Sequence, residues 1–463
     1  MTAATTTRDH ALVATLRTTV TGDVIDRADA RYDEARQVWN GLIDRHPAVV
    51  ARCTSRADVI AALGAAREYR PPVSIRGGGH QIAGSAVCDD GLVIDLSAMT
   101  DVIVDPDART ARVGPGARWA DVNTATQRHG LVVPGGEVSE TGVAGLTLGG
   151  GMGVLQRAYG LSCDALRSIE IVTADGTVRT ASRTEHPDLF WAARGGGRGL
   201  GVVTAFEFEL HALGPQVAMA QVIYPYDEAA SVLAAWRDLA PRMPETVSPE
   251  IALWSIPPDP AIPAEMHGVP MVMVAGLHAG PVDEGLEVLA PLTRLGTPMM
   301  DASAVVDYAT SQTGPDPLFP AGARYFFKSH FLSEFDDDAV AAVLAAGDTR
   351  PTPQSLVIVR TMGGAIGRVG PGESAFAHRG ARFNVSIDAG WTDPAMDDAA
   401  IGWARGAWDS LTPFATGGVY VNFAGLDDDS DRGAVFGTHA ARLDAIQRTY
   451  DPDGLLAGAA ARH

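Results

Sequence analysis

The sequence predicts an α+β fold with two domains, one rich in glycine and one dominated by a sheet. A length of 463 residues is too great for one ordinary hydrophobic core. Two glycine-dense stretches, 76–84 and 134–153, lie in the first half, and glycine becomes sparser beyond Pro215. Beyond Pro215 the sequence shows patterns typical of strands, and helical patterns lie between groups of these strands. This arrangement favours one antiparallel sheet covered by helices on a single face.

The first half is expected to hold short helices and strands around the glycine stretches. Helical spacing after a polar start predicts helices at 55–69 and 119–127. An apolar run predicts a buried strand at 92–96, and two strand patterns around a proline–aspartate turn predict a hairpin across 102–113. We expect a loose terminus before a short helix at 12–16, because the chain begins with alanine and threonine.

The second half is expected to supply the sheet and its helices. Strands are predicted at 217–224, 251–256, 271–277, 324–331, 355–362 and 382–389. Helices are predicted at 228–239, 282–295, 337–346 and 399–410, with a last helix at 440–450. The helices should cover the face of the sheet that carries more apolar side chains.

Period-two alternation along these strands predicts which side chains share a face. Lys328 and His330 lie on the same side of one strand, and Asp388 lies on the polar side of another. Arg360 stands in an otherwise apolar strand. We expect these four side chains on the face that the helices leave open, where a ligand would bind. A solvated sheet face with scattered charges is the alternative.

The first glycine stretch, 76–84, follows a strand-like run and predicts an anion-binding turn. Glycines let backbone N–H groups approach a ligand closely, and successive N–H groups form a nest that suits a pyrophosphate. Arg76 could grip phosphate oxygens through two parallel hydrogen bonds. His80, directly behind the glycines, is a neutral nucleophile near pH 7. A plain glycine-rich turn with a solvated histidine is the alternative for this stretch alone.

Further motifs follow the second glycine stretch in a recognisable order. They are the segment Tyr159-Gly-Leu-Ser-Cys-Asp164, a hairpin at 169–178, and the segment Asp188-Leu-Phe-Trp-Ala-Ala-Arg-Gly-Gly-Gly197 with Gly201-Val-Val-Thr204. In this order and spacing the motifs resemble the FAD-binding domain of the vanillyl-alcohol-oxidase superfamily, specifically the berberine-bridge-enzyme-like oxidoreductases. The resemblance begins near residue 32 and extends to about residue 212, with a weaker echo near the C-terminus. No GxGxxG follows a strand, which disfavours a nicotinamide-type Rossmann domain.

The resemblance implies a domain organisation and a cofactor. It implies a PCMH-type FAD-binding domain over 1–212, a substrate-binding domain over 213–410, and a C-terminal segment over 411–463 that returns to the first domain. It also implies that His80 is bonded covalently to the flavin 8α-methyl group. Many relatives add a cysteine tether at the position of Val138, but valine cannot form a thioether, so a single histidyl link is expected. The expected cofactor-binding residues are Arg76, Gly77, Gly78, Gly79, His80, Gln81, Gly84, Ser85, Gly135, Val138, Thr141, Gly142, Gly145, Gly150, Gly153, Asp164, Val203, Tyr420 and Asn422.

The implied reaction is hydride transfer from a small-molecule substrate to FAD, which O2 then reoxidises. Oxidation of an alcohol also needs a base for the hydroxyl proton. We predict Tyr420 as this base and Arg360 or Lys328 as the charge that lowers its pKa, with His330 and Asp388 as alternates. Each of these residues is also compatible with a substrate contact or a structural role. The small side chains of Val138 and Thr141 should leave O2 access to the flavin.

Three outcomes for the function of such a protein stay open. An oxidase would release H2O2 from an alcohol, sugar or amine, whereas an oxygenase would place an oxygen atom on a secondary-metabolite, polyketide-like substrate. Segments such as Trp39-Asn-Gly and Ile171-Val-Thr-Ala-Asp-Gly resemble a flavin-dependent oxygenase of polyketide biosynthesis, although Ile358 replaces a glutamate expected in its substrate sheet. A flavin-binding scaffold without turnover is the third outcome. It is kept because the asparagine-rich pattern of relatives is missing after Tyr450-Asp-Pro.

Composition excludes several other classes. A net charge of −20 and an isoelectric point near 4.9 disfavour nucleic-acid binding, because phosphates would be repelled. No run of about 18 apolar residues predicts a membrane span, and no secretory signal is recognisable at the N-terminus. Three cysteines without CxxC or metal-ligand spacing predict neither disulfides nor a metal site. We therefore expect a cytoplasmic protein, monomeric or homodimeric.

Overall fold

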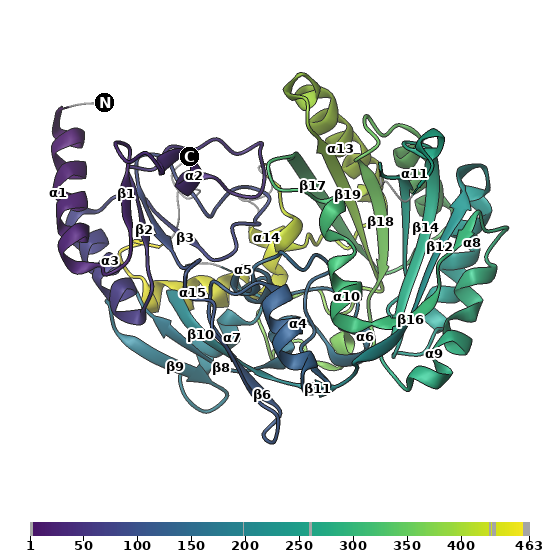
Figure 1. Cartoon of the computed structure of the whole chain (residues 1–463), viewed down its shortest axis with the longest axis horizontal. Helices are drawn as coiled ribbons and strands as arrows, with labels where there is room; N and C mark the ends of the chain where they lie inside the picture. Colours follow the sequence, from purple (N-terminus) through teal and green to yellow (C-terminus); the bar gives the residue numbers. More distant parts are fainter. Residues whose placement is uncertain (1–2, 198, 259–261, 426, 428–431, 457–463) are drawn as a thin grey trace.

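The structure is a computed structural model that describes residues 3–197, 199–258, 262–425, 427 and 432–456 (Figure 1). The chain opens with helix α1 (Ala3–Thr19), which packs against α3 (Arg56–Tyr69). The predicted helix at 12–16 lies within α1, but the expectation of a loose terminus before it is wrong from Ala3 onward. Leu12 and Leu16 lie one helical turn apart and are fully buried beside α3, and this packing holds a segment that has little amphipathic pattern of its own.

Two sheets make up the first half of the chain. The smaller one joins four strands in the order β1 (Val24–Asp26), β2 (Val49–Arg52), β4 (Leu92–Asp95) and β3 (Val73–Arg76). The larger one joins five antiparallel strands in the order β5 (Val102–Asp105), β6 (Thr110–Val113), β10 (Val202–Glu209), β8 (Leu166–Val172) and β9 (Val178–Ser182). The predicted strand at 92–96, both hairpins and the helix α4 (Trp119–Gln127) are confirmed.

An antiparallel sheet of eight strands dominates the second half. Its strands are β12 (Gln216–Pro225), β13 (Glu250–Ser255), β14 (Pro270–His278), β15 (Met300–Asp301), β16 (Ala304–Asp307), β17 (Arg324–Leu332), β18 (Leu356–Thr361) and β19 (Phe383–Trp391). The order along the sheet is β15-β12-β14-β13-β18-β19-β17, and β16 also pairs with β12. Helices α8 (Ala229–Leu239), α9 (Val282–Leu289), α11 (Asp337–Asp348) and α13 (Asp397–Leu411) cover one face, as predicted (Figure 1).

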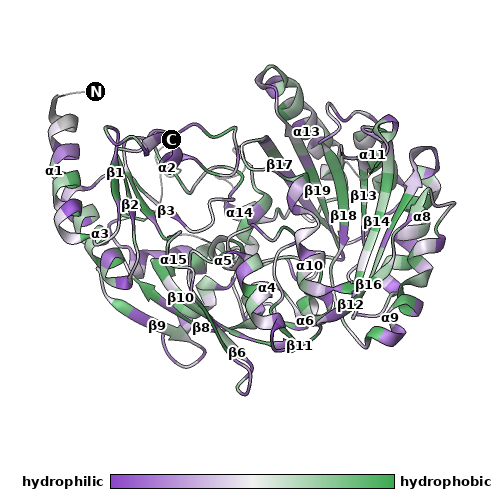
Figure 2. Ribbon diagram, in the orientation of Figure 1, coloured by the Kyte–Doolittle hydropathy of each residue, from purple (hydrophilic) through white to green (hydrophobic). Residues whose placement is uncertain are grey.

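The main core of the second half lies between the sheet and these four helices. Val359 of β18 and Val385 of β19 are buried there against Val343 of α11 and Trp236 of α8. Figure 2 shows the apolar character of the central strands of this sheet. Because side chains alternate along a strand, residues on either side of these valines point to the opposite face, toward the glycine-rich half of the chain.

Strand β17 departs from the sequence-based expectation. Phe326 belongs to the core under the helices, so Lys328 and His330 also face α13. The ammonium of Lys328 lies 4.3 Å from the centre of the Trp408 ring, and His330 Nε2 lies 3.0 Å from the Trp408 carbonyl oxygen. The prediction that Lys328 and His330 line a ligand site is therefore wrong. The opposite side of β17 carries side chains that are no less apolar. Hydrophobicity alone therefore could not predict which side of the strand faces the helices.

The described residues of the last part of the chain, 432–456, pack against the first half. The segment 417–423 ends in a 3-10 turn at Val421–Phe423 rather than in a strand, and β-alternation does not apply there. Helices α14 (Arg432–Phe436) and α15 (Ala440–Tyr450) then contribute to the core beneath the five-stranded sheet. The atypical end of the chain, 457–463, lies outside the described residues.

Candidate active site

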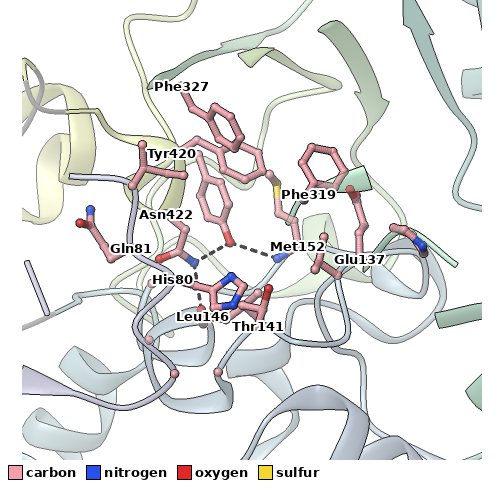
Figure 3. A pocket seen from close by; sticks show the side chains of 18 of the residues that line it. His80, Gln81, Glu137, Thr141, Leu146, Met152, Phe319, Phe327, Tyr420 and Asn422 are labelled. Atoms are coloured by element: carbon pink, nitrogen blue, oxygen red, sulfur yellow. Dashed lines mark hydrogen bonds between the residues drawn. The ribbon is translucent and has the colours of Figure 1, made fainter. Parts of the chain in front are cut away.

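A cavity of about 600 Å³ lies between the glycine-rich half and the open face of the eight-stranded sheet. One wall is made by the loops around 77–86 and 137–149, and the other by side chains of β12, β13, β14, β18 and β19. Figure 3 shows His80, Thr141 and the Tyr420 hydroxyl gathered in one part of this cavity, with Phe327 and Phe319 farther along it.

The two glycine stretches touch each other at the cavity wall. A Cβ atom on Gly78 would lie 2.5 Å from Gly142 Cα, so the loops can approach this closely only without side chains. Gly145 and Gly197 differ, because both line the cavity and a Cβ atom there would meet no protein atom within 4 Å. Such a Cβ atom would project into the cavity. The bare backbone at these two positions fits a large cofactor that lies against the loops.

His80 lines the cavity and is half-buried. Its ring stacks on Trp39 with 5.0 Å between ring centres and 15° between planes. Within the described residues the imidazole makes no hydrogen bond. Burial, and then the positive charge of Arg118, lower the pKa of His80 to about 4. The imidazole is therefore neutral at pH 7 and can act as a nucleophile.

Most of the predicted cofactor-binding residues line the cavity, although contact with a cofactor stays a prediction for each. Those that line it are Gly77, Gly78, Gly79, His80, Gln81, Ser85, Val138, Thr141, Gly142, Gly145, Val203, Tyr420 and Asn422. Those that lie outside the lining are Arg76, Gly84, Gly135, Gly150, Gly153 and Asp164. The four glycines of the second group serve close packing instead. For example, a Cβ atom on Gly153 would lie 1.9 Å from the carbonyl oxygen of Gly135.

Arg76 and Asp164 are used in buried ion pairs. Arg76 Nη2 lies 2.7 Å from the carboxylate of Asp95, and Arg76 Nη1 donates to the Gln37 carbonyl. Asp164 is paired with Arg379 at 2.6 Å. The prediction that Arg76 grips phosphate is wrong, because its charge is already neutralised by a carboxylate that is itself completely buried. The same reasoning removes Asp164 from the cofactor site.

Tyr420 is buried beside the second glycine stretch and acts as a hydrogen-bond acceptor. Its hydroxyl oxygen accepts from the backbone N–H of Gly151 at 2.9 Å, from Met152 at 3.1 Å and from Asn422 Nδ2 at 2.9 Å. Burial raises the pKa of Tyr420 to about 12, and these three donors offset only part of the rise. The predicted lowering of this pKa by Arg360 or Lys328 is wrong. The contacts with Gly151 and Met152 hold the loop at 151–152 in place, and Figure 3 shows the Tyr420 hydroxyl between Met152 and Asn422.

A cluster of carboxyl groups surrounds Arg360 on the sheet side of the cavity. Arg360 Nε and Nη2 each lie 2.7 Å from the carboxylate of Glu137, and Arg360 Nη1 is buried without a partner among the described groups. Glu250 Oε2 lies 3.8 Å from Arg360 Nε. Asp388 also lines the cavity and accepts a hydrogen bond from the Ser386 hydroxyl. One guanidinium is thus shared among three carboxyl groups.

The crowding of these carboxyl groups changes their protonation. Burial, and then the nearby charge of Glu137, raise the pKa of Glu250 to about 8, although Arg360 opposes the shift. Burial likewise raises the pKa of Asp388 to about 6 against the opposing effects of Arg360 and Ser386. Within the cluster Glu250 therefore retains its proton to a higher pH than Asp388 does. Glu137 and Glu250 were not among the residues predicted from the sequence, and the glycine pair before Glu137 is the one sequence signal for the first of them.

The remaining surface of the cavity is mainly apolar. The sheet contributes Trp254, Met273 and Ile358, and the loop after α10 (Tyr308–Thr313) contributes Phe319. This part of the cavity suits an apolar or aromatic body whose polar end lies at the carboxyl cluster. In the described part of the chain there is no group of three or more histidine, cysteine, aspartate or glutamate side chains that could hold a metal ion. No described helix is long and apolar enough to cross a membrane.

Fold and site together define a flavin-binding oxidoreductase, and comparison with known proteins agrees. The FAD binding domain family matches residues 47–182. An uncharacterized FAD-linked oxidoreductase of Bacillus subtilis (strain 168), YgaK, is 31% identical over 449 residues, which cover 95% of this chain and 96% of that protein. The chain therefore belongs to the FAD-linked oxidoreductases.

Two solved structures share the whole fold. Physcomitrella patens BBE-like 1 superposes with a TM-score of 0.86 at 23% identity, covering 96% of this chain and 97% of its own. The 6-hydroxy-D-nicotine oxidase from Arthrobacter nicotinovorans gives a TM-score of 0.85 at 26% identity, covering 94% of this chain and 96% of its own. The predicted family, the α+β fold and the class of enzyme are confirmed.

Proposed function

We propose that this protein oxidises a small-molecule substrate by hydride transfer to an FAD that is attached to His80 alone, with O2 as the oxidant. The observation that carries the proposal is the layout of the cavity. A neutral imidazole faces it from the glycine wall, and ionisable carboxyl groups face it from the sheet. When bound, FAD supplies the two-electron redox chemistry, and the chain supplies binding, orientation and proton transfer.

The glycine wall is proposed to hold the cofactor. Gly77, Gly78 and Gly79 offer backbone N–H groups, and Gly145 and Gly197 leave the room that the cofactor needs. Val138 lines the cavity but has no atom able to form a second covalent bond. This supports His80 as the single proposed point of attachment.

Asp388 is the residue that best suits the role of base. Its raised pKa of about 6 leaves it ionised above that pH, yet close enough to neutrality to accept a substrate proton efficiently. Tyr420 is less suited, because its hydroxyl already accepts three hydrogen bonds and its pKa is about 12. We assign Tyr420 to positioning the loop at 151–152. The unpartnered Nη1 of Arg360 supports a hydrogen bond from this residue to a substrate oxygen.

The fate of O2 separates the two proposed reaction types. In the oxidase reaction the substrate loses a hydride and a proton, and O2 takes up two electrons and two protons to give one H2O2 per substrate. In the oxygenase reaction one oxygen atom ends in the product, a secondary metabolite of polyketide type, and the other leaves as water with the two electrons and two protons that the substrate gives up. The small side chains of Val138 and Thr141 at the cavity support O2 access in both cases. Measuring peroxide per substrate consumed tests the choice, because a ratio of one contradicts the oxygenase reaction.

An amine oxidase is the second candidate, and the excess of carboxyl groups favours it. The cavity holds Glu250 and Asp388 beyond the Glu137–Arg360 pair, and a protonated amine would compensate the negative charge of Asp388 and could hydrogen-bond to Glu250. The similar structure named above as 6-hydroxy-D-nicotine oxidase supports the same choice. Anaerobic reduction of the flavin by matched pairs of aromatic amines and alcohols separates the candidates. Reduction by the alcohols alone would contradict the amine reaction.

The wider organisation is part of the proposal. We assign 1–212 to FAD binding, 213–410 to substrate binding and 411–463 to a segment that returns to the first domain. The course of the eight-stranded sheet supports this division. The described cysteines Cys53, Cys88 and Cys163 are all free and buried, which supports a reducing, cytoplasmic location.

A further inference from the structure

The orientation of His80 depends on a stack of aromatic rings. The Trp39 ring stacks on His80 and also on Tyr325, and the Trp39 and Tyr325 rings lie 4.0 Å apart between centres with 8° between their planes. Phe327 closes one edge of Trp39 in a T-shaped contact at 6.4 Å. The imidazole makes no hydrogen bond to any described residue, so no partner atom fixes its ring plane or its tautomer. Stacking is the contact that remains to orient it.

Trp39 is itself held by three hydrogen bonds to two different segments, the glycine turn and the loop at 319–322. Its indole Nε1 donates to the Phe319 carbonyl at 3.0 Å, and its backbone N–H donates to the Gly79 carbonyl at 3.1 Å. Its own carbonyl accepts from Gly322 N–H at 2.9 Å. Tyr325 behind it donates its hydroxyl to the Pro320 carbonyl at 2.9 Å. The ring that faces His80 is thus fixed both to the glycine turn and to the substrate side of the cavity.

We propose that Trp39, backed by Tyr325, is the positioning residue that sets the ring plane of His80 and thereby controls the rate at which flavin becomes attached. The proposal rests on the histidyl link of the proposed function. Attachment joins a ring nitrogen of His80 to the 8α carbon of the flavin. The imidazole N–H and the methyl group each lose one hydrogen atom, which amounts to two protons and two electrons in total. O2 takes these up and forms H2O2. A nucleophile that must meet one carbon atom gains rate from a fixed direction.

Attachment is measured directly by mass rather than by turnover. The full-length chain is produced in a riboflavin auxotroph so that it lacks flavin, and is then incubated with saturating FAD in air. The peptide that contains residue 80 is followed over time for the added flavin mass. Trp39→Leu should slow attachment about three- to tenfold, which corresponds to the loss of one aromatic stacking pair. Trp39→Phe keeps a flat ring and should recover most of the rate.

Two controls separate positioning from a loss of stability. Trp403→Leu removes another tryptophan whose Nε1 donates to a backbone carbonyl, that of Ala346, in the helical layer away from the cavity. It should leave the rate unchanged. FAD affinity is compared between His80→Ala and His80→Ala/Trp39→Leu, because neither protein can form the covalent link. The fold-change in affinity between these two proteins should be smaller than the fold-change in attachment rate between the parent and Trp39→Leu. Tyr325→Leu, which keeps Trp39 but removes its backing, should slow attachment in the same direction.

The outcomes distinguish this proposal from the one it rests on. A parent chain that never gains the flavin mass contradicts the histidyl link itself. A parent that gains it, together with Trp39→Leu or Tyr325→Leu at the parental rate, overturns the positioning role alone. Equal slowing in Trp39→Phe and Trp39→Leu would also overturn it, because the flat ring would then contribute nothing.

Discussion

Replacing Arg360 with methionine tests the carboxyl cluster, because it removes the guanidinium and keeps most of the side-chain volume. The side chain of Arg360 is 7% exposed and that of its partner Glu137 is 23% exposed, so the pair is largely removed from water. Breaking a buried ion pair by removing one partner costs about 3–5 kcal/mol. We expect the substitution to lower the free energy of unfolding by about 3 kcal/mol. This is the lower end of that range, because Glu137 is partly exposed and its neighbouring carboxyl groups can hold protons.

The substitution also shifts the protonation of the cluster. Arg360 lowers the pKa of both Asp388 and Glu250, so its loss should raise both values further. If Asp388 is the base, the rate of flavin reduction rises with pH as this group ionises, and the midpoint should move upward from about 6 in Arg360→Met. Stopped-flow reduction across pH 5–9 measures the midpoint, and urea unfolding measures the stability.

Arg382→Met is the matched control for this experiment. Arg382 lies 3.2 Å from Glu334, but the two side chains are 51% and 76% exposed, so the loss should be under about 1 kcal/mol. An Arg360→Met protein with an unchanged pH midpoint would refute the assignment of Asp388 to the proton transfer. A loss of stability no larger than that of Arg382→Met would refute the buried pair.

Three further substitutions test separate parts of the site. Tyr420→Phe leaves the N–H groups of Gly151 and Met152 without their acceptor and should lower the free energy of unfolding by about 1–3 kcal/mol while leaving the pH midpoint of flavin reduction in place; a shifted midpoint would return Tyr420 to the role of base. Lys328→Met should leave flavin reduction unchanged, because Lys328 lies under α13, and a large loss of rate would contradict that placement. Glu250→Gln should flatten the pH dependence of stability in flavin-free protein, measured as the melting temperature. Burial raises the pKa of Glu250 from 4.5 to about 8, so the parent loses stability as pH rises through this window, and an equal slope in the variant would contradict the shift.

The sequence predicted those features that depend on local patterns. Helix α4 matches its predicted range to the residue, because a short amphipathic pattern with clear ends decides it. The two glycine stretches and His80 were placed at one site because several motifs in order are more specific than any one of them. Arg360 was expected on the open face of the sheet, and it lines the cavity there. The expectation followed because a charged side chain in an otherwise apolar strand needs a charged or polar partner, which the core under the helices would not supply.

The features that the sequence could not predict depend on long-range pairing. Glu250 lies beside Arg360 because β13 and β18 pair in a register that places the two residues opposite each other, and alternation within one strand carries no such information. Both faces of β17 are covered, one by α13 and the other by rings such as Trp39, so its more polar side could not be identified as open or closed. Arg76 was expected to bind a phosphate because its actual partner could not be recognised. That partner, Asp95, lies on a neighbouring strand, and the sequence does not show that the two strands pair.

The mass of the peptide that contains residue 80 tests the central claim most directly. Protein purified in the dark is denatured in acid, digested and analysed by mass spectrometry, with His80→Ala treated in parallel. The account predicts that the parental peptide carries one FAD less two hydrogens, and that the variant releases its flavin on denaturation. A native protein that binds FAD but yields an unmodified peptide would contradict it.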